Sequence, residues 1–129
     1  MAERGYTPIH VLSLFSQQSL IAGTSATSMV IDLHNIAQKG HFALAVKTQS
    51  GTNGTCGTTV FTYQGASLRN GTYVTPSTAT PIGTAGTSGT TDIITFFPEP
   101  MPFMKIVAGQ AGSAGVGGDT VLTAELIVQ

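Results

Sequence analysis

Strict alternation of apolar and other side chains, at a period of two, is the feature that most constrains how this chain can fold. The segment 42–46 alternates Phe, Leu and Val with Ala, and the same pattern recurs over 29–33, 104–108 and 122–128. Successive side chains of a strand point to opposite faces of its sheet, so each segment predicts a strand with one buried face. We therefore expect an all-β chain built from antiparallel sheets.

Three further segments, 9–15, 59–64 and 92–97, are predicted strands with less clear faces. In 9–15 both faces are apolar, which is expected of a central strand or of a strand that a neighbouring subunit covers. Glycines and prolines separate these segments, as turns require. The prolines and glycines of 75–91 leave no room for a regular element there, and Asn70-Gly71 predicts a tight turn.

Two other stretches, 50–57 and 110–118, are predicted loops, and only 32–39, closed by Gly40, is predicted to make a helical turn. About eight strands at this spacing indicate an antiparallel β-sandwich, jelly-roll-like. We expect a flexible N-terminal arm over 1–8 and a single sandwich domain over 9–129.

Charged side chains are few and scattered. The chain has 20 threonines and 16 glycines but only five basic and six acidic residues, with a formal net charge of −1. No basic stripe could follow a phosphate backbone, so neither nucleic acid nor an anionic membrane is an expected partner. No signal-like leader and no apolar run of roughly 18 residues occur, so we expect synthesis in a cytoplasm. A neutral, hydroxyl-rich exterior favours packing against other protein.

No pattern of catalytic or metal-binding residues is present. His34 and His41 flank the predicted turn, and Asp32 lies close by, but their spacing matches no known ligand pattern, and ordinary polar histidines are expected. The acidic residues are dispersed, and no nucleophile lies beside a base. The single cysteine, Cys56, is expected to be an inert thiol in a loop. We therefore expect no enzyme activity, no cofactor and no metal.

The segment 96–103, Phe-Phe-Pro-Glu-Pro-Met-Pro-Phe, is the most unusual stretch of the chain. Alternate prolines impose an extended backbone that cannot donate ladder hydrogen bonds. It is interpreted either as a connection between the two sheets or as an apolar clasp on a neighbouring subunit. Met101 and Phe103, together with Tyr6 and Ile9 near the N-terminus, are the predicted partner contacts.

The order of segments resembles a family of small β-sandwich proteins encoded among the virion genes of tailed phages. The resemblance runs through 28–33, 40–47, 103–108 and 118–129 as a pattern of strands. It implies a capsid decoration (cement) or accessory virion protein on the capsid surface, a homotrimer without catalysis that binds the major capsid protein. The family has no shared functional motif, so no binding residue is carried over. The long 75–91 loop departs from the pattern and suggests a host-contact element.

Two alternatives stay open. The chain could be a tail, fibre or head-vertex component of the same particle. A soluble carbohydrate-binding module is a different class, but such modules use exposed aromatic rings as stacking platforms. The chain has no tryptophan, and its only tyrosines are Tyr6, Tyr63 and Tyr73.

Overall fold

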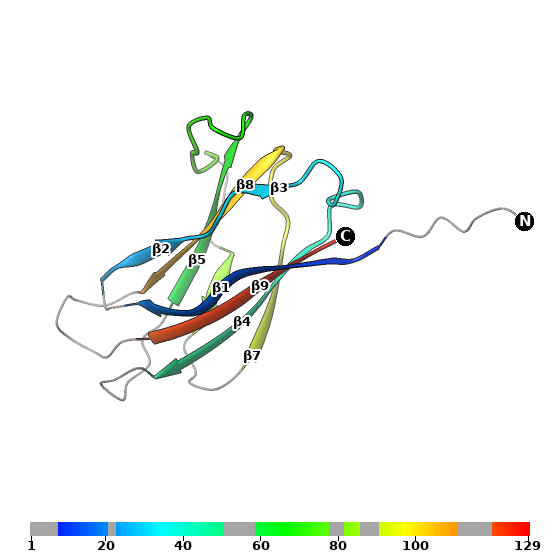
Figure 1. The fold of residues 1–129 in the computed structure, drawn as a ribbon. Coiled ribbons are helices and arrows are strands. Elements are labelled where there is room, and N and C mark those ends of the chain that lie inside the picture. Colours follow the sequence, from blue (N-terminus) through cyan, green and yellow to red (C-terminus); the bar gives the residue numbers. More distant parts are fainter. Residues whose placement is uncertain (1–7, 21–22, 51–58, 78–81, 86–90, 111–119) are drawn as a thin grey trace, which may run out of the picture.

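Two antiparallel sheets packed face to face make up the computed structural model of this chain (Figure 1). It describes residues 8–20, 23–50, 59–77, 82–85, 91–110 and 120–129. Sheet A contains, in order across the sheet, β1 (His10–Leu20), β9 (Thr120–Val128), β4 (Phe42–Ser50) and β7 (Thr91–Phe96). Sheet B contains β2 (Ser25–Thr27), β8 (Phe103–Gln110), β5 (Thr59–Ala66) and β6 (Gly83–Ala85), and β3 (Ile31–Asp32) also pairs with β8. The predicted all-β sandwich is confirmed.

The core lies between the sheets and follows the predicted alternation. Leu44 and Val46 of β4 are fully buried, and Leu126 of β9 lies beside Leu44 in the strand register. From sheet B, Phe61 and Ile106 are fully buried as well. Burying one such side chain contributes roughly 1.5–3 kcal/mol, so these inward stripes are the main source of stability.

The strand over 9–15 lies at the edge of sheet A, so the central strand is excluded and cover by a neighbouring subunit stays a prediction. Among the described strands β1 pairs with β9 alone, and its register shifts between Ser13 and Phe15 and again before Gln18. A β-bulge adds an unpaired residue and rotates the strand. Leu12 therefore packs against the core, and Phe15, three positions later, is buried in it. At the second shift Gln17 has a φ of 49°, and its N–H donates to Thr123 Oγ1 at 3.2 Å.

The predicted stripe over 29–33 is interrupted, and Met29 is 54% exposed although Ile31 and Leu33 are buried. Ser28 separates β2 from β3, and its hydroxyl accepts the backbone N–H of Ile106 at 2.9 Å. A serine side chain thus takes the place of a backbone carbonyl in the ladder, as serine readily does. The strand therefore breaks at this point, and Met29 turns outward.

A short strand lies inside 75–91, where no regular element was predicted. β6 pairs with β5, and the buried Ile82 donates its N–H to the carbonyl of Phe61 at 2.8 Å. A Cβ on Gly83 would lie 2.9 Å from Ile94 Cγ2. Gly83 therefore permits close packing of a strand rather than a turn. The neighbouring residues 78–81 and 86–90 lie outside the described residues.

The predicted turns within the described residues are confirmed. The helical turn is shorter than the predicted 32–39, because Asp32 belongs to β3 and the turn covers 34–36. The carbonyl of Leu33 accepts the N–H groups of Ile36 and Ala37, and Gly40 follows the turn with a φ of 69°. Gly71 donates to the carbonyl of Leu68 at 3.0 Å, which closes the turn at Asn70-Gly71. The predicted arm and loops at 1–7, 51–58 and 111–119 lie outside the described residues, and so does Cys56.

The proline-rich segment is a connection between the sheets. Residues 97–102 join β7, at the edge of sheet A, to β8, inside sheet B. The interpretation as an ordered crossing is therefore confirmed. The connection passes the helical turn at one end of the sandwich, where the two form a cleft.

Candidate functional site

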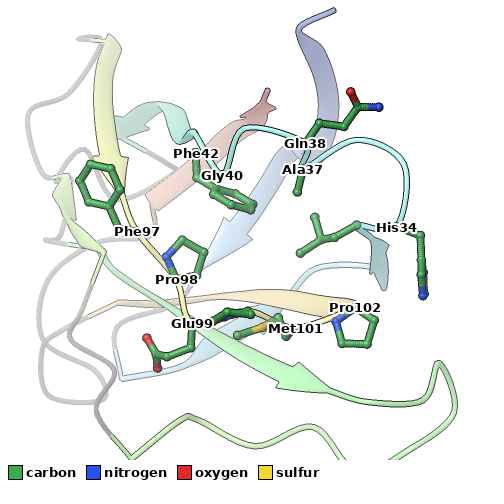
Figure 2. A pocket seen from close by; sticks show the side chains of 12 residues that line it. His34, Ala37, Gln38, Gly40, Phe42, Phe97, Pro98, Glu99, Met101 and Pro102 are labelled. Atoms are coloured by element: carbon green, nitrogen blue, oxygen red, sulfur yellow. The ribbon is translucent and has the colours of Figure 1, made fainter. Parts of the chain in front are cut away.

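A cleft of about 460 Å³ opens between the helical turn and the connection 97–102 (Figure 2). Phe42 lies between the two walls; Leu33, His34 and Gln38 belong to the first, and the prolines of the connection to the second. Those prolines hold the second wall extended without donors of their own. The volume is within the range of small-molecule sites, and the lining is mostly apolar.

One polar tie anchors the connection to sheet B. The Tyr63 hydroxyl, on the inner face of β5, donates a hydrogen bond to Glu99 Oε1 at 2.7 Å. Burial, together with the neighbouring Glu99 carboxylate, raises the pKa of Tyr63 to about 12. Glu99 Oε2 is buried and has no hydrogen-bond partner among the described residues. This pair holds the cleft wall in place.

A second polar pair belongs to the helical turn. Asp32 Oδ1 accepts the backbone N–H of His34 at 3.1 Å and contacts its Nδ1 at 2.6 Å. The backbone hydrogen bond, followed by the side-chain one, lowers the pKa of Asp32 below 3.8. The His34 ring lies edge-on to Phe103, with 5.2 Å between centroids. The carboxylate thus caps the start of the turn, a local structural task.

These groups do not converge on a reacting atom. In Figure 2 the side chains of His34 and Glu99 extend away from each other at opposite ends of the cleft. General acid–base chemistry needs two such groups within hydrogen-bond reach of one substrate. Within the ranges that the structure describes, no three His, Cys, Asp or Glu side chains are grouped to hold a metal ion. The cleft can enclose an apolar group but offers no paired acid and base.

Three of the four predicted partner contacts lie within the described residues, and their surroundings differ. Met101 is half-buried and packs on Gly65, where a Cβ would collide with its thioether. Phe103 is half-buried beside His34. Ile9 is 61% exposed at the start of β1 in sheet A, and Tyr6 lies outside the described residues. The structure therefore uses Met101 and Phe103 largely within the chain.

The outer face of sheet A is the surface that sequence reasoning missed. Strand register places Val11, Ile127, Ala43 and Thr95 in one row across it. Val11 is 56% exposed and Ile93, in the next row, 67%. We define this face by its outward residues: Val11, Ser13 and Ser19 of β1, Val121, Thr123, Glu125 and Ile127 of β9, Ala43, Ala45, Lys47 and Gln49 of β4, and Thr91, Ile93 and Thr95 of β7. Ile9 and Phe97 flank it, and Phe97 is 81% exposed.

A shallow hollow of about 160 Å³ lies on this face, with Ala43 and Ile127 among its lining residues. The alanines of β4 are small, whereas Val11 and Ile93 on the edge strands are large and exposed, so the face has both depressions and protrusions. The apolarity of both faces over 9–15 was the available sequence signal. It identified Ile9 but not the contribution of Ile93 from β7.

Neither the protein-family models nor the curated proteins include a match to this chain. Among the described residues, no helix is long and apolar enough to span a membrane.

Proposed function

We propose that this chain is a structural protein of a tailed-phage virion, a capsid decoration or cement protein that binds the major capsid protein and stabilises the shell. It works by contact and not by catalysis. The proposal also includes self-association: the resemblance of the sequence implies a trimer, the two-fold pair inferred below is the competing state, and the mass of the chain in solution decides between them. A tail, fibre or head-vertex position in the same particle is the alternative location.

The connectivity of the sandwich supports a jelly roll. If β2 and β3 are counted as one interrupted strand, the eight strands alternate between the sheets except at β5 and β6, which are consecutive in sheet B, and the orders are β1-β9-β4-β7 and β2-β8-β5-β6. Two interlocked Greek keys give these orders, and viral capsid domains are among the proteins that use this architecture. A shared fold alone does not assign a function. The functional argument therefore depends on the surface.

The observation that carries the proposal is the outer face of sheet A. Val11 and Ile93 are more than half exposed there, and Lys47 and Glu125 are the only charged side chains that its register places outward. Contiguous apolar patches on soluble chains mark contact surfaces. A protein that must fit among other subunits needs such a neutral face.

Binding to capsid shells tests the function. Shells assembled from the major capsid protein encoded with this chain are mixed with the purified full chain, sedimented and imaged. We expect the chain to co-sediment and to add density at the joints between capsid subunits, and shells that carry it to resist heating better than bare shells. Chain that stays in the supernatant, or density confined to the tail of complete virions, would overturn the decoration role.

A further inference from the structure

We propose that the outer face of sheet A binds the same face of a second copy of this chain, about a two-fold axis that runs parallel to the strands between β4 and β9. The inference rests on the proposed function for the idea that this face makes protein contacts, and it names the partner. The contact is isologous, which means that each copy offers the same surface to the other.

Strand order makes the face suited to this symmetry. Sheet A has four strands, with β9 and β4 in the middle and β1 and β7 at the edges. A two-fold axis between the central strands places β9 of one copy over β4 of the other, and β1 over β7. Two stacked sheets lie about 10 Å apart, with strand directions within about 30° of each other.

Side-chain sizes are complementary under this operation. Ile127 and Ala43 are register partners, so Ile127 of one copy lies over the partner's Ala43. By the same registers Ile93 of one copy lies over the partner's Ser13. A large side chain therefore faces a small one on both sides of the axis. Interdigitation of this kind is how two sheets fill the space between them.

Charge is complementary as well. Glu125 of one copy lies over the partner's Ala45, two residues along β4 from the partner's Lys47. Both side chains are exposed, and within the described ranges the only ion pair shorter than 4 Å joins His34 and Asp32. Neither Lys47 nor Glu125 is therefore paired with the other inside one chain. The two-fold contact brings opposite charges together twice.

The face is large enough for a specific contact. Its two central strands are nine residues long. With about 4.8 Å between strands and about 3.4 Å per residue, three strands of roughly 30 Å and the shorter β7 of roughly 20 Å present on the order of 500 Å². Two such faces hide on the order of 1,000 Å², the size at which specific interfaces begin.

The β1 edge of the same sheet is less suited to self-association. β1 has two register shifts along its length, and Gln17 adopts a left-handed conformation at the second. Bulges twist an edge strand away from the regular geometry that another strand needs for pairing. Contact through the face avoids this obstacle, because it needs no backbone hydrogen bonds.

The mass of the intact chain in solution tests the contact. Interfaces of modest area reach micromolar dissociation constants, so sedimentation equilibrium at roughly 100 µM protein populates the complex. We expect twice the 13.2-kDa mass of the chain. A mass of one chain, or of three, would overturn the two-fold contact.

A matched pair of variants locates the contact. Ile93→Lys places a charge in the apolar contact and should raise the dissociation constant at least ~100-fold. Leu68→Lys is the control, because Leu68 is 69% exposed against 67% for Ile93 but lies in the turn after β5. Circular dichroism establishes that both variants fold. An unchanged mass for Ile93→Lys, or equal dissociation of both variants, would exclude this face.

Charge exchange tests the symmetry itself. Lys47→Glu and Glu125→Lys should each weaken the dimer about tenfold, since like charges then meet on both sides of the axis. Mixed together, the two variants should pair with each other, because every contact again joins opposite charges. The mixture is measured at about 150 mM salt to screen long-range attraction. No preference for the mixed dimer would contradict the two-fold arrangement.

Capsid binding separates this inference from the proposed function. A chain that forms the dimer but does not bind shells would leave the contact standing and remove the decoration role. A wild-type chain that binds shells but has the mass of one chain at the same concentration would remove the two-fold contact and leave the decoration role standing.

Discussion

The outward side chains of the two sheets differ in how exposed they are. On sheet B, the outward residues Thr62 of β5 and Lys105 and Val107 of β8 are all half-buried. Lys105 lies with its ammonium 4.2 Å from the centre of the Tyr73 ring, which the turn after β5 brings over this face. On sheet A, Ile93 is 67% exposed. Sheet B is thus partly covered by its own chain, whereas sheet A leaves Val11 and Ile93 more than half exposed.

The largest effect we expect is a difference in unfolding free energy between substitutions of an inward and of an outward residue of β9. Leu126 is fully buried and Ile127 is half-buried on the outer face. Leu126→Ala should lower the free energy of unfolding by about 2–5 kcal/mol. Ile127→Ala should lower it by about 1 kcal/mol or less, because only cross-strand contacts are lost. Urea unfolding of dilute protein, where self-association does not contribute, measures both values.

Equal losses for Leu126→Ala and Ile127→Ala would break the comparison. They would mean that the outer face of sheet A stabilises the chain itself, so its apolarity would need no partner. The slope of unfolding against urea should stay unchanged in both variants, which shows that the same surface is exposed on unfolding.

The hydrogen bond between Tyr63 and Glu99, which joins sheet B to the proline-rich connection, should make the stability of the chain depend on pH in the alkaline range. The pKa of Tyr63 is raised from 10.0 to about 12, so between these values the folded chain keeps a proton that the unfolded chain releases. The free energy of unfolding should therefore fall by about 2–3 kcal/mol as pH rises through this interval. Tyr63→Phe should remove that loss, so the advantage of the wild type should narrow between about pH 10 and about pH 12.

Glu99→Gln is the matched control for this effect, because it keeps an acceptor for the Tyr63 hydroxyl but removes the negative charge. Burial is the largest cause of the raised pKa of Tyr63, so the alkaline loss should shrink but persist. An identical pH dependence for wild type and Tyr63→Phe would show that Tyr63 does not anchor the connection.

The smallest effect compares one lysine on each outer face. Lys105→Met removes the charge above the Tyr73 ring and should lower the free energy of unfolding by about 0.5–1 kcal/mol. Lys47→Met, on the exposed face of sheet A, should change it by less than about 0.5 kcal/mol in dilute protein. Chemical denaturation of the two variants gives both values. A greater loss for Lys47→Met would reverse the contrast between the faces.

Strands with regular alternation could be predicted from the sequence, and irregular ones could not. The stripes of β4, β8 and β9 were predicted to the residue, because a period of two is dictated by strand geometry. The stripe at 29–33 was wrong at Met29, where the Ser28 hydroxyl replaces a carbonyl in the ladder. β6 was missed because three residues of backbone pairing leave no periodic pattern. Its Gly83 resembles a turn residue but serves close packing.

The candidate surface was only partly predictable. Ile9 was a predicted contact and is exposed, but Met101 and Phe103 are largely occupied within the chain. Ile93 looked like any strand residue, since adjacent isoleucines at 93 and 94 hide which of them faces outward. Pairing with Ala45 of β4 settles that question, and no local pattern contains it.

The sequence by itself determined the class of fold, the positions of the inward stripes and the scarcity of charge, because alternation and composition are local properties of the chain. Only the tertiary structure decided that β1 is an edge strand, that the proline-rich segment crosses between the sheets and that Val11 and Ile93 are exposed on one outer face. Those features depend on which strands become neighbours. Neighbours are chosen by contacts between segments far apart in the chain, such as β1 with β9, which no single stretch of sequence describes.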